Sequence, residues 1–462
     1  MEKTNEQTLN KLGVQPIKKL MLSLGIPMII SMILQAVYNI VDSAFVSNMA
    51  QDGESALNAL TLAFPVQVLM VAVGIGTGVG VNALLSKSLG QGDKEKVGYT
   101  AGNAVILGII IYVIFLIFGF VGVDAYISSQ TSNELIFEMA SSYLKICCIW
   151  SMGIVFFSIF EKLLQSTGLS FYSTAAQITG AVINIVLDPI LIYGLLGLPE
   201  MGVKGAAYAT IIGQIASFVM ALFFHLKKNK DVPMGLKYFK LSGKIVKGIY
   251  AIGLPAIIAQ ALMSVMTYCL NVILVKTGES LVTAYGLYYK IQQFVLFAAF
   301  GLRDAITPIV SFNHGMKSRE RVKQGEKYGI LYTLIIMVIG LVLIEVLAVP
   351  FAKIFGLSGE TQELCISAMR IISISFVFAG LNIALQGVFQ ALNSGLESLI
   401  ISICRQFLFI VPTTWGISKL IGNSVDKAWV IWLAFPVAEA LSAIIACIFM
   451  RRINKNKVNV LD

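Results

Sequence analysis

The stretch LMLSLGIPMIISMILQAVYNIVDSAFVSNM, from Leu20 to Met49, decides how the rest of the chain is interpreted. It is long enough to cross a membrane, because the hydrocarbon core of a bilayer needs only about 20 consecutive apolar residues. Its one charged side chain is Asp42, and an ionisable group at membrane depth costs about 2.5–3.5 kcal/mol, so such groups usually have a function. A second carboxylate, Asp188, lies in the apolar stretch AVINIVLDPILIYGLLGL. Two such carboxylates predict an ion or proton site.

The composition places the whole chain in a bilayer. Of its 462 residues, 57% are hydrophobic and 13% are charged, and the mean hydropathy is +0.82, whereas a soluble protein carries about 25% charged residues. The polar start MEKTNEQTLNKLGVQ has no signal cleavage site, so the first apolar run is expected to remain as a membrane helix. The net charge of +9 resides in loops, which indicates topology and no nucleic-acid partner. The six cysteines lack CxxC spacing, which favours buried thiols over metal ligands.

Apolar runs separated by polar breaks predict an all-α membrane protein with twelve transmembrane helices. Their approximate limits are 17–47, 56–86, 97–120, 136–160, 171–195, 203–225, 246–275, 281–312, 324–350, 362–389, 396–420 and 428–450. Most Lys and Arg residues lie in alternate loops, above all after the sixth span, at Lys227, Lys228, Lys230, Lys237, Lys240, Lys244 and Lys247. Because basic loops stay inside, this asymmetry predicts a multi-pass protein of the cell (inner or plasma) membrane with both termini cytoplasmic.

The two halves of the chain resemble each other. LGIPMIISMILQAV, from Leu24, matches IGLPAIIAQALMSV, from Ile252, so that Pro27 aligns with Pro255. The tripeptide GES follows in both halves, and the polar segments LGQGDKEKV and NHGMKSRERV then end on a valine. This order predicts two pseudo-symmetric six-helix bundles, related as parallel repeats, with a central cleft. The expected divisions are an N-terminal lobe at 1–225, a cytoplasmic basic linker at 226–247 and a C-terminal lobe at 248–462.

The predicted topology brings polar groups from three spans to one depth. Asp42 lies near the outer end of the first span, and Asn184 and Asp188 share one face in the outer half of the fifth. The sixth span starts outside, so Ala206 and Thr210 lie in its outer half too. Carboxylate, amide, hydroxyl and carbonyl oxygens suit a hard cation. A proton or a cation can neutralise two nearby carboxylates, so Na⁺ and H⁺ both stay open as the coupling ion, and no other cofactor is expected. The alternative is hydrogen bonding between packed helices.

Other residues of the first span are candidates for substrate contact and for bending. Gln35, Tyr38 and Asn39 precede Asp42 and are expected to line a substrate cavity, or else to pack against other helices. Pro27 lacks an N–H group and therefore predicts a bend in this span. Our hypothesis is that protonation or ion binding at Asp42 shifts the span between straight and bent forms. A passive kink is the alternative.

Two glutamates are secondary candidates. Glu439 lies in the last span after a proline and is the runner-up for a second titratable site. Glu161 lies beside Lys162 near the inner end of the fourth span, where a boundary ion pair is expected and a role in transport is the alternative.

Four motifs occur in order along nearly the whole chain. They are P-x7-Q-x2-YN-x2-D at 27–42, N-x3-DP at 184–189, G-V-x-G-A-A-x-A-T at 202–210 and TPIVSFNHG at 307–315. With them the chain resembles the multidrug and toxin extrusion (MATE) family, and more narrowly its DinF-like prokaryotic branch. The resemblance implies a secondary active antiporter that exports amphipathic, often cationic, drugs and toxins in exchange for Na⁺ or H⁺ by alternating access. It also implies a cation site, Na⁺ if the transporter is sodium-coupled, at Asp42, Asn184, Asp188, Thr210 and the carbonyl region near Ala206.

Other function classes fit less well. A lipid-linked precursor flippase of the same superfamily would need a strongly basic central cavity, whereas nearly all Lys and Arg residues here lie in loops. An enzyme would need a nucleophile–base pair or metal ligands at membrane depth, and the chain has no HExxH, GxSxG or P-loop motif. The glycine-rich GIGTGVGVN at 74–82 lies within the second span, where small residues permit close helix contact. The expected partners are therefore small-molecule substrates and the lipid bilayer, and the expected state is a monomer.

Overall fold

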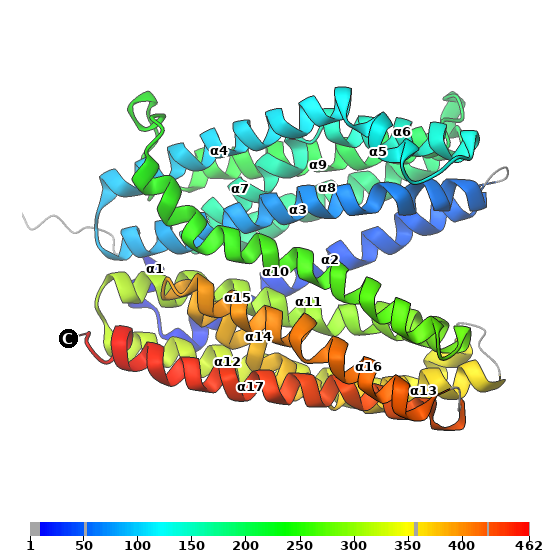
Figure 1. The fold of residues 1–462 in the computed structure, drawn as a ribbon. Helices are drawn as coiled ribbons and strands as arrows, with labels where there is room; N and C mark the ends of the chain where they lie inside the picture. The colour runs from blue at the N-terminus through cyan, green and yellow to red at the C-terminus, as the bar shows by residue number, and fades with distance from the viewer. Residues whose placement is uncertain (1–9, 50–52, 355–358, 423–424, 462) are drawn as a thin grey trace, which may run out of the picture. The chain divides into compact units, whose positions relative to one another are not determined.

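The computed structural model describes residues 10–49, 53–354, 359–422 and 425–461, and all regular structure in these ranges is helical (Figure 1). Within the described ranges, ten helices are long and apolar enough to cross a bilayer, and two pairs of shorter helices each pass the same test as one bent span. The all-α class and a total of up to twelve spans confirm the fold class predicted from the sequence.

The chain divides into two compact units. Unit 1 contains residues 30–257 and the described part of the segment before Pro16, and unit 2 contains Pro16–Ile29 and residues 258–462. The helices up to the middle of the chain are α1 (Lys11–Val14), α2 (Ile17–Ser47), α3 (Gly53–Gly90), α4 (Lys94–Val121), α5 (Val123–Ser128), α6 (Glu134–Ile149), α7 (Met152–Ser166), α8 (Ser170–Ile192), η1 (Leu195–Gly197), α9 (Val203–Lys228) and η2 (Leu236–Tyr238). The remaining helices are α10 (Gly243–Val275), α11 (Glu279–Gly315), α12 (Arg319–Ile354), α13 (Gly359–Ser373), α14 (Phe376–Ala391), α15 (Gly395–Ile403), η3 (Cys404–Leu408), α16 (Ile410–Ile421), η4 (Val425–Leu433), α17 (Ala434–Ile453) and η5 (Asn454–Val458).

Two predicted spans are bent. Helices α6 and α7 meet at 44° and helices α13 and α14 meet at 50°. At the breaks the Ser151 N–H donates to the carbonyl of Cys148 and the Ser375 N–H donates to the carbonyl of Ile372, three residues back in each case. This tighter hydrogen bonding interrupts the α-helical pattern. The two serines lie 224 positions apart, close to the spacing of the repeated motifs, so the corresponding span of each half is broken at the corresponding position.

Helices α2 and α10 each contribute to both units. The division falls after Ile29 in α2 and after Ile257 in α10, two residues beyond Pro27 and Pro255 respectively. A proline inside a helix removes one backbone hydrogen bond. Each helix that passes from one unit to the other therefore carries its weakest point next to the crossing.

Glycines of α3 allow two helices to pack against it closely. A Cβ atom at Gly78 would lie 2.7 Å from the Cγ atom of Lys162 in α7, and one at Gly80 would lie 2.0 Å from the carbonyl oxygen of Ile249 in α10. Only a residue without a side chain fits against backbone at that distance. The glycine-rich stretch 74–82 thus serves helix packing in unit 1.

Candidate functional site

Two hydrogen bonds fix the register of α2 against α8 in unit 1. The Ser31 hydroxyl donates to Gln177 Oε1, and the hydroxyl of Tyr193, the residue that caps α8, donates to the carbonyl of Phe45 at 2.7 Å. The bonded residues are 146 and 148 positions apart, so the two helices run parallel with this offset. Asp42 and Asp188 are also 146 positions apart, and they therefore lie at the same level on neighbouring helices.

Helix α9 brings Thr210 to this level. A Cβ atom at Gly213 would lie 3.0 Å from the Cβ atom of Asn184, and one at Gly205 would lie 2.5 Å from the carbonyl oxygen of Leu191. Helices α8 and α9 are therefore antiparallel and in close contact, and Thr210 lies between these two contact points. Ala206, one turn nearer the start of α9, is fully buried.

The cluster contains three buried oxygens that have no hydrogen-bond partner among the described residues: Asp42 Oδ1, Asn184 Oδ1 and Asp188 Oδ2. Asn184 Nδ2 donates to Asp188 Oδ1 at 3.3 Å, and Asp188 is 0% exposed. The Asp42 carboxylate is close enough to Asp188 to interact with it electrostatically. A buried polar atom without a partner costs about 1–3 kcal/mol, and more when it is charged. A cation or a proton at this cluster relieves that cost.

The atoms of the cluster that could ligate a cation are oxygens. Hard monovalent and alkaline-earth cations prefer oxygen ligands. Within the described ranges there is no group of three or more His, Cys, Asp or Glu side chains that could hold a metal ion. A cation at this cluster would therefore depend on two carboxylates together with the neutral oxygens of Asn184 and Thr210.

A cavity adjoins the cluster inside unit 1. Its lining comes from α2, α3, α7, α8 and α9 and includes the polar residues Gln35, Tyr38, Glu161, Gln177, Asn184 and Thr210. The cavity volume is about 50 Å³, and one water needs about 10–15 Å³, so several waters fit. Gln35 and Tyr38 thus line a cavity. The side chain of Asn39 lies outside the described residues, and Pro27 belongs to the part of α2 that is in unit 2.

Gln177, which was not predicted from the sequence, lines the cavity and accepts a hydrogen bond from Ser31. Gln177, Asn184 and Asp188 are spaced by seven and four residues, so they lie on one face of α8. This spacing of polar residues in an apolar span is the signal that could have found it.

Glu161 and Lys162 lie deeper in unit 1 than expected. Lys162 is 1% exposed and Glu161 is 6% exposed, and both line the cavity. Their charged atoms are 3.8 Å apart. Gln165 connects them, because its Oε1 accepts from Lys162 at 2.9 Å and its Nε2 donates to Glu161 at 3.0 Å. The expected ion pair is present, but it is a buried part of the cavity wall and not a boundary pair.

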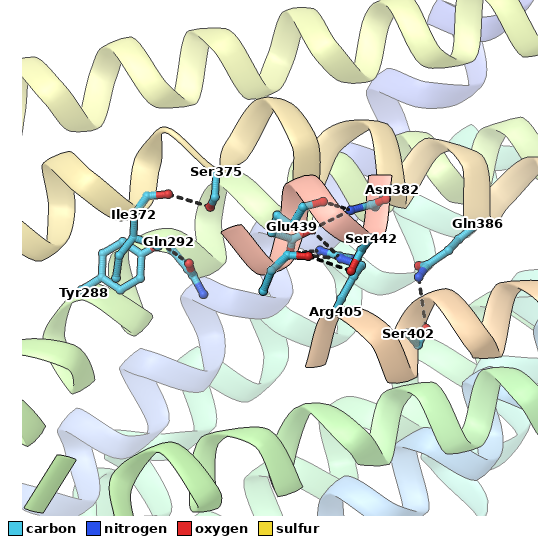
Figure 2. A network of polar contacts seen from close by, with 11 residues as sticks. Tyr288, Gln292, Ile372, Ser375, Asn382, Gln386, Ser402, Arg405, Glu439 and Ser442 are labelled. Atoms are coloured by element: carbon cyan, nitrogen blue, oxygen red, sulfur yellow. Dashed lines mark hydrogen bonds and ion pairs between the residues drawn. The ribbon is translucent and has the colours of Figure 1, made fainter. Parts of the chain in front are cut away.

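Glu439 lies in unit 2, where it forms the centre of a separate polar network (Figure 2). Arg405 donates three hydrogen bonds of 2.8–3.0 Å to its carboxylate, and Asn382 Nδ2 donates a fourth at 2.8 Å. Arg405 comes from the π-helical segment η3, which turns its side chain toward α17. The charge of Glu439 is thus balanced by a guanidinium, whereas no ion pair among the described residues includes Asp42 or Asp188.

Both halves of the chain match the same protein family. The family model described as MatE matches residues 27–190 and again 255–415. The two matches begin at Pro27 and Pro255, the two prolines that align in the sequence repeat, so both halves are copies of one domain.

Relatives cover nearly the whole length of the chain. Multidrug export protein MepA of Staphylococcus haemolyticus (strain JCSC1435) is 25% identical over 448 residues, 96% of each chain. MepA of Staphylococcus aureus (strain MRSA252) is 24% identical over 435 residues, 94% of each chain.

Among solved structures, an outward-facing multidrug resistance MATE family transporter of the MOP superfamily has a TM-score of 0.89 and 26% identity, over 98% of this chain and 100% of that one. A MOP superfamily transporter from Pyrococcus furiosus, whose binding pocket is described as having reverse polarity, has a TM-score of 0.88 and 27% identity, over 98% and 99% of the two chains. On the strength of the repeated family match and these full-length relatives, the chain belongs to the MatE family of membrane transporters.

Proposed function

We propose that this chain is a secondary active antiporter that exports amphipathic, often cationic, small molecules across the cell membrane in exchange for Na⁺ or H⁺. The observation that carries the proposal is the pair of carboxylates, Asp42 and Asp188, at one level of unit 1 with buried oxygens that lack partners. The names of its MepA relatives, multidrug export proteins, support the substrate class.

The coupling step follows from electrostatics. Two carboxylates in a medium of low dielectric constant repel each other, and the repulsion ends when a cation lies between them or a proton binds to one. Na⁺ would be held by Asp42, Asn184, Asp188 and Thr210, with the carbonyl region near Ala206 as a further source of oxygen, and would supply the neutralising charge. Either ion changes the force between α2 and α8. A bend of α2 at Pro27 would transmit this change, because proline weakens the helix there.

The cavity beside the carboxylates is the proposed substrate site, with Gln35, Tyr38 and Asn39 as contacts. Its one lysine, Lys162, lies next to Glu161, so the excess charge near the cavity is that of the two aspartates. An excess of negative charge attracts organic cations. It does not favour a lipid-linked diphosphate, the substrate of a flippase. We further propose that the antiporter works as a monomer by alternating access, with both termini in the cytoplasm.

The test is dye export from vesicles that contain the purified chain, under a Na⁺ gradient and a proton gradient applied separately. Asp42→Asn and Asp188→Asn are compared with Asp124→Asn, which removes an exposed carboxylate that pairs with Lys145 outside the cluster. We expect one gradient to drive export by the wild type and by the control, and neither gradient to drive it in the two cluster variants. Export that survives both cluster substitutions would remove the coupling role. Export that requires ATP would remove the antiporter proposal.

A further inference from the structure

Residues 229–242, which join α9 to α10 within the predicted linker at 226–247, are firmly attached to unit 1. We call residues 229–242 the linker. At its far end Asn103 of α4, which is 0% exposed, donates to the carbonyl of Lys240 at 3.0 Å and accepts from the N–H of Ser242 at 2.8 Å. At its start the side chain of Asn229 donates to the carbonyl of Leu163 at 3.0 Å. Hydrogen bonds therefore hold the linker at both ends, through the side chain of Asn229 at its start and through its backbone at Lys240 and Ser242.

A notch in α4 holds the centre of the linker. Cβ atoms at Gly98 and Gly102 would lie 2.6 Å from the ring of Tyr238 and 2.2 Å from its carbonyl oxygen. The ring of Tyr99 packs edge-on against that of Tyr238, with 5.4 Å between centroids. The linker thus has a defined conformation, and the side chains that it turns outward are presented by a rigid backbone.

Several of these outward side chains are apolar. Leu236 is 91% exposed, Leu241 is 58% exposed, and Met234 and Phe239 are also exposed. The linker projects sideways from the end of unit 1, beside the start of α4, and does not continue along the helix axes (Figure 1). Because the flanking helices cross the bilayer, a sideways projection at their ends lies at the level of the lipid head groups. Apolar side chains at that level can enter the boundary of the acyl chains.

Basic side chains surround this apolar surface. They are Lys227, Lys228, Lys230, Lys237, Lys240, Lys244 and Lys247, and none of them takes part in the ion pairs found among the described residues. The single carboxylate of the linker, Asp231, accepts a hydrogen bond from Asn10 at 2.6 Å. The linker therefore combines exposed apolar side chains with uncompensated positive charge, a combination that anionic lipid surfaces attract.

We propose that the linker is a docking surface for anionic phospholipids of the adjacent leaflet, which is the inner leaflet in the predicted topology. Leu236, Phe239 and Leu241 enter the acyl boundary, and the ammonium groups of Lys237 and Lys240 bind head-group phosphates. Through this surface, unit 1 binds the membrane by way of anionic lipids. This interaction is independent of the exported substrate and of the coupling ion.

Lipid binding to the purified full chain in neutral detergent tests the proposal. The chain is titrated with phosphatidylglycerol, phosphatidylcholine and inorganic phosphate, and bound molecules are counted by native mass spectrometry. Each lysine near an anionic surface contributes about fivefold in affinity, so Lys237→Gln with Lys240→Gln should weaken phosphatidylglycerol binding on the order of 25-fold. Lys204→Gln with Lys276→Gln, at the far ends of the two helices that flank the linker, is the matched control and should change little. Equal losses in both pairs, or equal binding of phosphatidylcholine, would contradict the proposal, and lysine-dependent binding of phosphate alone would show an anion site without lipid recognition.

Insertion of the apolar side chains is tested by a Leu236→Trp variant in nanodiscs. Phosphatidylglycerol with brominated acyl chains should quench the added fluorescence, after subtraction of the signal from the four native tryptophans. Asn103→Ala keeps every lysine but releases the linker, and it should reduce the quenching when combined with Leu236→Trp. An unquenched tryptophan, or quenching that Asn103→Ala leaves unchanged, would overturn the rigid docking surface described here.

Discussion

Replacing Arg405 by methionine tests how unit 2 holds the charge of Glu439. The substitution removes three hydrogen bonds to the carboxylate and leaves the bond from Asn382 at 2.8 Å. The side chains of Arg405 and Glu439 are 8% and 17% exposed, so solvent cannot replace the lost guanidinium. The carboxylate would then lie in a largely apolar surrounding with one neutral donor.

The expected loss can be estimated from other buried ion pairs. Breaking such a pair by removing one partner destabilises a protein by about 3–5 kcal/mol, whereas replacing both partners by apolar residues is often neutral. Because Glu439 keeps the bond from Asn382, we expect a loss of about 3 kcal/mol for Arg405→Met. For a unit of about 200 residues this corresponds to a decrease in Tm of roughly 6–12 °C. The double variant Arg405→Met with Glu439→Leu should regain most of it.

Thermal unfolding of the purified chain in detergent measures both variants. Arg370→Met is the matched control, because its ion pair with Glu345 is 4.0 Å long and the Arg370 side chain is 54% exposed. Pairs of that kind contribute about 0–1 kcal/mol, so this control should unfold close to the wild type. If Arg405→Met unfolds like the control, or if the double variant is as unstable as Arg405→Met, the guanidinium does not stabilise unit 2 by balancing the charge of Glu439.

Three further predictions concern unit 1. Gly80→Ala should destabilise unit 1 by about 1–3 kcal/mol through overpacking against α10. The control Gly286→Ala adds a Cβ atom that meets no atom within 4 Å and should be neutral or stabilising. Thermal unfolding compares the two variants. Lys162→Met should cost about 3–5 kcal/mol, because it removes the ammonium that lies 3.8 Å from the buried carboxylate of Glu161. A second change, Glu161→Gln, should restore most of the loss in Tm. The hydrogen bond from Lys145 lowers the pKa of Asp124, so its small stabilising effect is present above about pH 4 and is lost as the pH falls through the lowered pKa. Asp124→Asn should remove this part of the pH dependence of Tm, and high salt should weaken it in the wild type.

The features that could be predicted from the sequence are those with a local cause. Apolar runs of sufficient length predict spans, and the order of polar motifs predicts the repeat. The bends in the spans of α6–α7 and α13–α14 could not be predicted, because neither break contains a proline or a glycine. A serine at each break, Ser151 and Ser375, is too common in membrane helices to serve as a signal.

Some features of the candidate site also follow from the sequence, whereas others do not. A common depth for Asp42 and Asp188 follows from span direction alone, and the α2–α8 register gives them that common level. The position of Lys162 does not follow from its own segment, because it depends on the absence of a side chain at Gly78 of α3. The pairing of Arg405 with Glu439 depends on a π-helical turn and on contact across 34 residues, neither of which has a local pattern.

The repeat also shows how the two units differ in charge. When Pro27 is aligned with Pro255, the position of Asp42 corresponds to Leu270, which is 0% exposed. In unit 2 the acids Asp304, Glu345 and Glu439 each lie next to an arginine. The two repeats thus share their helices but differ here: Asp42 and Asp188 of unit 1 interact with each other, and among the described residues neither forms an ion pair with a basic side chain.

This difference between the units bears on the proposed ion coupling. A bound ion shifts a conformational equilibrium only by as much as its affinity differs between the two states. If both units held the same ion site, binding would act on both alike and the two effects would not distinguish one unit from the other. If the proposed coupling is correct, the interacting carboxylates of unit 1 make that half the one that responds to the ion, while Glu439 of unit 2 is paired with Arg405. Glu439→Gln should therefore lower Tm but leave unchanged which gradient drives dye export, and a change in that ion dependence would place a second coupling site in unit 2.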